Sequence, residues 1–349
     1  MGKTVGIIGA GAWGTALASA LAREGNDVVL WARNERVADE INRGHTNSRY
    51  LPGFPLAESL RATTDCAEAA GGKEFVLVAS PSLYLASTVA QLRAVPSVQD
   101  GRACIGALTK GFVDSPDGPK LILETMEALL PRCYEKNLVY IAGPSHAEEV
   151  ATGKLTGLVA ASENPKNSIR FRELLCVKGI MAYSSFDVVG VQICAAAKNV
   201  IAVVFGSLDA LSETSAFFGD NAASFLLAGG LNEIQTLGFA LGATHPETFT
   251  SIAGVGDLDV TCRSKYGRNR RFGRDLILRG VLSRFSGIDD LIARIGELGY
   301  LPEGVVACKF IRQIADRRRL RLPICDGLYR ILNKEITPGD FLQQVASAL

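Results

Sequence analysis

Short apolar runs alternate with helix-forming stretches in the first part of the chain. Residues 4–14 begin with an apolar run that predicts a strand, residues 15–23 are strong helix formers, and Asp27–Trp31 predicts a second strand. Residues 42–55 are rich in Asn, Gly and Pro and predict a loop, followed by a helical stretch. The order of strand, helix and strand is that of a βαβ unit.

The same alternation continues to about residue 186. Further strands are predicted over residues 75–79, 104–108, 138–142, 157–161 and 180–184, and a helix over residues 120–130 that ends before Pro131. Strands that alternate with helices predict a parallel sheet covered on both faces. Beyond Asp187 the strand pattern stops, and long helical patterns dominate to the C-terminus.

A glycine motif occupies the first strand-to-helix junction, where Gly9, Gly11 and Gly14 have the spacing G-x-G-x-x-G. Gly9 allows a sharp turn, Gly11 leaves room for a pyrophosphate, and Gly14 allows close packing of helix and strand. Backbone N–H groups at the helix start would face the phosphates. Such a motif can also be an ordinary turn, but the βαβ context favours a dinucleotide site. We therefore predict an α/β Rossmann-type dinucleotide-binding domain over residues 1–186 and an all-α substrate and catalytic domain over residues 187–349.

The end of the second strand bears on the choice of nucleotide. An acid about 20 residues beyond the fingerprint usually binds the adenosine ribose, but this chain has Ala32-Arg33-Asn34 there, and Glu35 comes slightly late. The Arg33 guanidinium can accept a 2′-phosphate, which predicts NADP, with NADPH preferred, or tolerance of both NADP and NAD. The alternative interpretation is a solvated surface arginine.

Composition narrows the classes of partner. Of the 349 residues, 48% are hydrophobic and 21% charged, and 37 basic against 36 acidic side chains leave a formal charge of +1. This balance favours neither nucleic acid nor an anionic membrane as the main partner. The eight cysteines form no C-x-x-C pair and are interpreted as buried thiols of a reducing compartment. The three histidines are isolated, so no metal site is predicted.

Two stretches bear on localisation. The first strand begins within a few residues of Met1, with no charged-then-apolar leader, so we expect a cytoplasmic protein. Residues 188–208 have the length of a membrane span, but Gln192, Lys198 and Asn199 lie at the centre, where a charge is expensive in lipid. A buried helix without stable membrane insertion is therefore predicted.

Polar clusters follow several predicted strands, and ligands of open parallel sheets bind at the carboxyl ends of the strands. These clusters are residues 80–82, 109–111 and 143–146. Lys110 directly follows its strand and precedes Gly111, so its ammonium can face the crevice. A surface lysine is the alternative interpretation.

The helical half contains a lysine in apolar surroundings and a glycine-flanked acid. Lys198 follows three alanines and precedes an apolar run, and such burial disfavours the charged amine, which suits a group that exchanges a proton near neutral pH. A lysine that reaches solvent from the helix edge is the alternative. Asp257 follows Gly254-Val255-Gly256, and its carboxylate can point at a hydroxyl or at a lysine. The basic run over residues 263–273 precedes a helix and predicts an anion site, although it also fits a solvated surface.

These motifs together resemble a known family. GAGAWGTALA, LTKGF, GPSHAEEV, AAAKNVIAV, GVGDLDVTC and GRNRRFG occur in the order and at the separations typical of bacterial-type NAD(P)-dependent glycerol-3-phosphate dehydrogenases, from residue 4 to about Gly304. The resemblance implies reversible hydride transfer between a nicotinamide and carbon 2 of sn-glycerol 3-phosphate or dihydroxyacetone phosphate, a phosphorylated triose. The product would supply the glycerophospholipid backbone. A homodimer is left open.

The resemblance also implies roles for individual residues. Lys198 would be the proton donor and acceptor, with Lys110 and Asp257 beside the reacting oxygen, and Arg268 with Asn269 would hold the substrate phosphate. The implied substrate-binding set is Lys110, Gly143, Ser145, Lys198, Asp257, Gly267, Arg268 and Asn269. The implied cofactor-binding set is Gly9, Gly11, Ala12, Trp13, Gly14, Arg33, Lys110, Ala147, Arg268, Leu301 and Glu303.

Several positions depart from the family pattern. Ala223 replaces a usual basic residue, Ala228-Gly229 replaces a Thr-Arg pair, and Gly267 replaces a common Ser. Residues 301–304 read Leu-Pro-Glu-Gly in place of a more usual Val-x-Glu-Gly. These changes bear on phosphate contacts and helix packing.

Two rival hypotheses follow from the same residues. A β-hydroxyacid or ketopantoate-type reductase also joins a nucleotide domain to a helical domain with a lysine, but it acts on carboxylates, whereas the basic run suits a phosphate. A non-catalytic nucleotide sensor would bind NADPH without turnover, and Lys198 argues against it.

Overall fold

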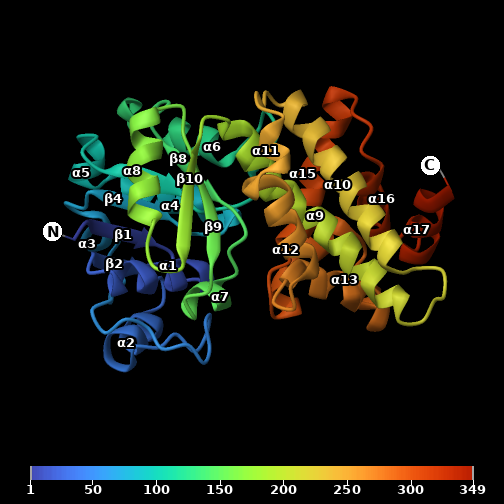
Figure 1. Ribbon diagram of the computed structural model, residues 1–349, viewed down its shortest axis with the longest axis horizontal. Coiled ribbons are helices and arrows are strands. Elements are labelled where there is room, and N and C mark those ends of the chain that lie inside the picture. Colours follow the sequence, from blue (N-terminus) through green and yellow to red (C-terminus); the bar gives the residue numbers. More distant parts are fainter. Residues whose placement is uncertain (1, 348–349) are drawn as a thin grey trace. The chain divides into compact units, whose positions relative to one another are not determined.

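The computed structural model describes residues 2–347, with side chains described as far as residue 344. The chain folds into two compact units (Figure 1). The first contains the residues up to 113 and residues 120–191, and the second contains residues 114–119 and the chain from residue 192 onward. A short loop inside the first half of the sequence therefore belongs to the second unit.

An eight-stranded sheet forms the centre of the first unit, in the order β10-β9-β8-β5-β4-β1-β2-β3. Its strands are β1 (Thr4–Ile8), β2 (Asp27–Trp31), β3 (Arg61–Thr63), β4 (Phe75–Val78), β5 (Cys104–Ala107), β8 (Val139–Ala142), β9 (Thr156–Ala161) and β10 (Ile180–Ser185). β1, β4 and β5 are buried over all or nearly all of their lengths, as expected for apolar strands covered on both faces. The predicted α/β class is confirmed.

One pairing in this sheet differs from the all-parallel prediction. β8 and β9 run antiparallel, with Tyr140 opposite Ala161, whereas the other neighbouring strands of the sheet are parallel. The connection from β8 to β9 holds one short helix, α7 (Ala147–Ala151). The connection covers residues 143–155, and a parallel crossover would have to carry the chain back along the whole strand to the opposite edge of the sheet. The short helix instead leaves the chain at the edge where β8 ended, so β9 enters the sheet in the opposite direction.

Helices pack on both faces of the sheet. α1 (Ala12–Arg23), α7 and α8 (Pro165–Leu175) contribute buried side chains to one cluster with β1, β4, β5 and β8. α3 (Cys66–Ala70) contacts the other side, where a Cβ on Gly6 would lie 2.2 Å from the Ala69 carbonyl oxygen. The remaining helical elements are α2 (Glu35–Gly44), η1 (Ser82–Tyr84), α4 (Leu85–Arg93), α5 (Pro96–Gln99), α6 (Ile122–Leu129) and η2 (Arg132–Tyr134).

Two predicted boundaries in the first unit were wrong. The loop expected over residues 42–55 begins only after α2, whose Asn34 N-cap accepts a hydrogen bond from the Arg36 amide. The helix expected from residue 120 begins at Ile122, because Lys120–Leu121 forms β7 and pairs with β6 (Phe112–Val113) in a hairpin. The sequence did not predict β6 and β7, because a strand of two residues is too short to show an alternation of apolar and polar positions.

The second unit is built around α9 (Val188–Ser212), which is buried over most of its length. Neighbouring helices approach it through glycines: a Cβ on Gly273 would lie 1.9 Å from the Val203 oxygen, and one on Gly304 would lie 2.4 Å from the Asn199 oxygen. The other elements are α10 (Asp220–Ala240), α11 (Glu247–Thr250), the π-helical turn η3 (Ile252–Gly256), α12 (Asp257–Arg263), α13 (Arg268–Leu278), η4 (Val281–Arg284), α14 (Ile288–Ala293), η5 (Ile295–Leu298), α15 (Glu303–Arg318), α16 (Pro323–Leu332) and α17 (Pro338–Ser347).

α9 is long and apolar enough to cross a membrane by length and composition. Its most apolar window of 18 residues is 89% buried inside the protein, however. The helix is therefore a core element, as the polar residues at its centre predicted.

Candidate active site

The glycine loop after β1 has the geometry that a dinucleotide needs. Gly9 has a φ of +133°, and a Cβ there would lie 2.9 Å from the Ala79 backbone. A Cβ on Gly14 would lie 2.1 Å from the Gly9 oxygen, whereas one on Gly11 would meet nothing within 4 Å. Gly9 and Gly14 are thus required for the close backbone packing, and Gly11 faces open space. No side chain caps the N-terminus of α1, which leaves its amides for an anion.

A residue that the sequence analysis missed holds this loop. Asn47 is fully buried, and its amide donates to the Ala10 oxygen (3.1 Å) and to Thr15 Oγ1 (2.9 Å). Thr15 Oγ1 also donates to the Ala10 oxygen. Asn47 lies in the Asn-rich loop, and the sequence carried no pattern that pointed this loop back to the first helix.

Arg33 lies at the end of β2, as predicted. Its side chain is exposed, and the guanidinium carbon lies 5.5 Å from the centroid of the Tyr84 ring. Glu35, the late acid, is the first residue of α2. The cation at this strand end is therefore held against an aromatic ring and is open to a ligand phosphate.

Other predicted residues gather at the same carboxyl edge of the parallel strands. Lys110 follows β5 and precedes Gly111, whose φ is +106°. After β8, the Ser145 hydroxyl donates to the Gly143 oxygen (2.9 Å), and Ala147 begins α7. After β4, the Ser80 hydroxyl is buried without a hydrogen-bond partner among the described residues. This edge therefore carries charged and polar groups where ligands of parallel sheets bind.

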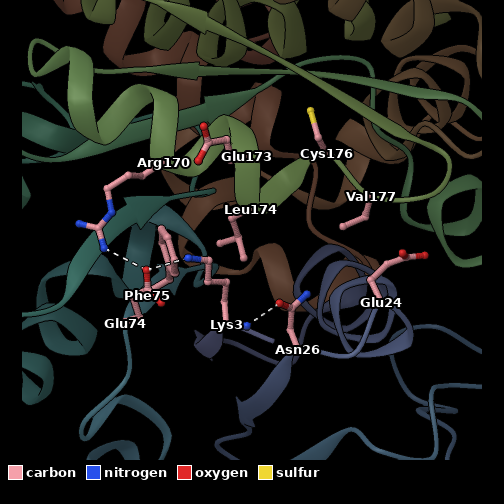
Figure 2. A pocket seen from close by; sticks show the side chains of 10 residues that line it. All are labelled: Lys3, Glu24, Asn26, Glu74, Phe75, Arg170, Glu173, Leu174, Cys176 and Val177. Atoms are coloured by element: carbon pink, nitrogen blue, oxygen red, sulfur yellow. Dashed lines mark hydrogen bonds and ion pairs between the residues drawn. The ribbon is translucent and has the colours of Figure 1, made fainter. Parts of the chain in front are cut away.

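A cavity of about 270 Å³ lies at the opposite edge of this sheet (Figure 2). Lys3 and Glu74 precede β1 and β4 directly, and both line it. Figure 2 shows Lys3 and Arg170 converging on Glu74, at 3.4 and 3.2 Å. Lys3 and Arg170 thus form ion pairs with Glu74, a carboxylate that itself lines the cavity. Because ligands of such sheets bind at the carboxyl ends, this cavity is separate from the nucleotide loop.

In the second unit, Lys198 and Asp257 form a buried ion pair. Lys198 Nζ bonds to Asp257 Oδ1, and their side chains are 5% and 1% exposed. Lys198 lies in the middle of α9, and Asp257 begins α12 directly after the η3 turn. π-helical turns are rare and frequent at functional sites. The prediction that the lysine is buried is confirmed, and the carboxylate next to it favours the charged ammonium, which opposes the effect of burial.

A chain of amide contacts extends from the residue next to Lys198. Asn269 Nδ2 donates to Asn199 Oδ1, and Asn269 Oδ1 accepts from the Gly304 amide, each at 2.9 Å. Asn269 is 7% exposed. The Asn269 carboxamide therefore joins α9, α13 and α15, contacts that the sequence analysis did not predict.

The arginines of the basic run differ in whether they form an ion pair. Arg270 bonds to Asp209 Oδ2 at 2.6 Å, as does Arg274 just beyond the run, and Arg263 bonds to Asp259. Arg268 is exposed, begins α13 after Gly267, and has no ion pair among the described residues. No side chain caps this helix start. Arg268 and the first α13 amides can therefore bind an anion.

The cysteines differ in part from the prediction of buried thiols. All eight are free, but Cys133 and Cys176 are exposed while the others are buried. Cys133 is the middle residue of the 3₁₀ turn η2, and Cys176 is the C-cap of α8. Burial raises the pKa of the Cys66 thiol to about 11.

A sheet with a glycine loop for a dinucleotide, joined to a helical unit with a buried lysine–aspartate pair, defines a nicotinamide-dependent dehydrogenase class. Residues 4–168 match the family model of the NAD-dependent glycerol-3-phosphate dehydrogenase N-terminus, and residues 187–343 match that of its C-terminus. The chain belongs to the NAD-dependent glycerol-3-phosphate dehydrogenase family.

Individual relatives agree with this assignment. A glycerol-3-phosphate dehydrogenase [NAD(P)+] of Treponema denticola is 56% identical over 99% of this chain and 98% of its own length. That of Ligilactobacillus salivarius is 36% identical, over 95% and 93%. The crystal structure of glycerol-3-phosphate dehydrogenase from Coxiella burnetii has a TM-score of 0.84 and 30% identity, and the match covers 99% of each chain. The protein is an NAD(P)-dependent oxidoreductase that acts as a glycerol-3-phosphate dehydrogenase, which settles the activity against both rival hypotheses.

Proposed function

We propose that Lys198 is the proton donor and acceptor of this dehydrogenase, with Asp257 and Lys110 beside the reacting oxygen. The observation that carries the proposal is the buried Lys198–Asp257 pair. Reduction of a ketone puts negative charge on its oxygen, and an ammonium at that oxygen stabilises the charge and then supplies the proton. The Asp257 carboxylate favours the return of a proton to the amine.

The phosphate of the substrate is assigned to Arg268 and the start of α13. Arg268 is the arginine of the basic run without an ion pair among the described residues, and it precedes uncapped helix amides. Gly267 and Asn269 flank it, and Gly143 and Ser145 complete the proposed substrate set. Binding energy from the dianion can orient carbon 2 for reaction.

The cofactor is assigned to residues that fit it locally. The positive φ of Gly9, the open space at Gly11 and the uncapped α1 suit a pyrophosphate. When bound, the nicotinamide supplies the hydride for carbon 2. The proposed contacts are Gly9, Gly11, Ala12, Trp13, Gly14, Arg33, Lys110, Ala147, Arg268, Leu301 and Glu303, with NADPH preferred through Arg33.

Location and pathway are part of the same proposal. We place the enzyme in the cytoplasm, where its product supplies the glycerophospholipid backbone. The eight free thiols suit a reducing compartment, and the buried α9 suits a chain without membrane insertion. Sedimentation of the purified chain tests the homodimer that the sequence leaves open.

The test of the proton donor is Lys198→Ala. Turnover of dihydroxyacetone phosphate should fall by about two to four orders of magnitude, because a general acid and a stabilising charge are lost together. NADPH affinity, measured by fluorescence titration, should survive. Lys309→Ala is the matched control, since Lys309 lies on the surface and pairs with Asp289.

A second variant separates chemistry from folding. Lys198→Ala leaves a buried carboxylate without its partner, which costs about 3–5 kcal/mol of stability. The double variant Lys198→Met with Asp257→Asn removes both charges and should fold, bind NADPH and remain inactive. Turnover near wild type in either folded variant would reject the assignment.

A further inference from the structure

The segment before α15 is attached to α13 by the side chain of Tyr300. Its hydroxyl donates to Asp275 Oδ2 at 2.7 Å, and the Arg271 guanidinium carbon lies 4.5 Å from the ring centroid. Arg271 and Asp275 lie one turn apart on α13, so they present adjacent side chains to Tyr300. The phenol is thus held both at its face and at its oxygen.

The charges around Tyr300 keep this attachment in one protonation state. Asp275 is buried and lies 3.2 Å from the Arg279 Nε and 3.8 Å from the Arg271 Nε. Burial, together with the hydrogen bond to Asp275, raises the pKa of Tyr300. The hydroxyl therefore stays a neutral donor to the Asp275 carboxylate.

The other end of the segment is attached to the same helix. The Gly304 amide donates to Asn269 Oδ1, on the same helix α13 and nearer its start than the two residues that contact Tyr300. Between the two attachments lie Leu301, Pro302 and Glu303, and the proline ring limits the backbone of this short stretch. Residues 301–303 are therefore fixed on both sides to the helix that begins with Arg268.

We propose that Tyr300 is a positioning residue for the cofactor, acting through Leu301 and Glu303. The contacts of Tyr300 with Arg271 and Asp275 set the position of the segment that carries Leu301 and Glu303. The inference rests on the proposed role of these last two residues in cofactor binding. Tyr300 itself touches neither substrate nor reacting atoms in this scheme.

The test is Tyr300→Phe, which deletes one hydroxyl and keeps the ring under Arg271. The dissociation constants of NADPH and NADH, from fluorescence titration of the full chain, should rise about three- to tenfold, less than the full worth of a hydrogen bond to a charged group because the contact acts on the cofactor only through the segment. At saturating cofactor, kcat and the KM for dihydroxyacetone phosphate should stay within about twofold. Tyr329→Phe is the matched control, since Arg312 also lies over the Tyr329 ring, at 5.7 Å.

A double-mutant cycle with Asp275→Asn tests the contact itself. The asparagine oxygen can still accept from Tyr300, so this variant should weaken cofactor binding less than Tyr300→Phe, and the two changes together should be non-additive. A loss that appears equally in kcat and in the KM for dihydroxyacetone phosphate would indicate a general structural role and overturn the proposal.

Glu303→Ala separates the proposed cofactor role of the segment from the proposed positioning role of Tyr300. If it leaves cofactor affinity unchanged, the proposed cofactor role of the segment fails. If Glu303→Ala weakens cofactor affinity and Tyr300→Phe does not, the segment binds the cofactor without help from the Tyr300 contacts. Only the positioning role of Tyr300 is then rejected.

Discussion

At Lys198, burial and pairing act in opposite directions on the charge of the amine. Burial by itself disfavours the charged ammonium, whereas a carboxylate at its side, here that of Asp257, favours it. A buried pair of this kind contributes little net stability, because desolvation of two charges offsets their attraction. Its value is chemical, since the ammonium is held in one place without competing water.

Arg33 gives a prediction about cofactor choice. A charge-assisted bond between its guanidinium and the 2′-phosphate of NADPH is worth about 1.5–3 kcal/mol, or roughly ten- to a hundredfold. Arg33→Asp should therefore lower kcat/KM for NADPH far more than kcat/KM for NADH. Stacking on the adenine is the alternative, since Arg33 already lies beside Tyr84.

The matched control for Arg33 is Arg36→Asp, an exposed arginine three residues further along the chain. It should leave the ratio of the two efficiencies unchanged. A proportional loss of both efficiencies in Arg33→Asp would contradict phosphate recognition and favour stacking.

Site residues were predictable where local sequence determined their surroundings. Gly9, Gly11 and Gly14 follow from backbone sterics within one turn, and the burial of Lys198 follows from the apolar residues around it. Asn47 was missed because its partners lie 32 and 37 positions away. Only the tertiary fold brings such partners together.

At the scale of elements, amides at the start of α16 donate hydrogen bonds to the buried side chain of Glu233 on α10. Glu233 accepts from the Ile324 amide at 2.5 Å and from the Cys325 amide at 3.0 Å. Glu233→Ala should lower the free energy of unfolding by about 1–3 kcal/mol for each amide left without an acceptor. Urea unfolding measures this, with the exposed Glu247→Ala as control.

The same carboxyl has a predicted pH dependence. Burial raises the pKa of Glu233 above its ordinary 4.5, against the lowering effect of the two amides. The folded protein therefore binds this proton more tightly than the unfolded chain, and the contribution of Glu233 to stability is greatest below pH 4.5 and falls as the pH rises toward the raised value. The difference in unfolding free energy between wild type and Glu233→Ala should shrink over that window. A difference that grows with pH would contradict it.

Helices and strands with strong periodicity were predicted well, and short or context-dependent elements were not. β1, β2, β4, β5 and β10 lie within a residue of their expected bounds. α2 has three buried residues on one face of a polar helix, a pattern that the sequence analysis did not recognise within the predicted loop region, and β3 has only three residues. The antiparallel entry of β9 depends on the length of α7, which a strand pattern does not encode.

At the scale of the whole molecule, the two units supply different chemistry. The first carries the dinucleotide loop and Arg33, and the second carries Lys198, Asp257 and Arg268. The near-zero net charge does not reveal this division, because it is a sum over all charged side chains of the chain. The class of protein and its activity could be predicted from the order of the motifs along the chain. The tertiary contacts that hold each motif in place could not.

The most direct test of the account compares dihydroxyacetone phosphate with unphosphorylated dihydroxyacetone. kcat/KM for both, with NADPH, is measured in wild type, in Arg268→Ala and in the control Lys265→Ala, an exposed cation in the same run. The wild type should strongly prefer the phosphorylated ketone, and Arg268→Ala should reduce this preference by about 2–4 kcal/mol, or roughly 30- to 1,000-fold, while Lys265→Ala preserves it. An Arg268→Ala enzyme that retains the wild-type preference would contradict the assignment of the substrate phosphate to the start of α13.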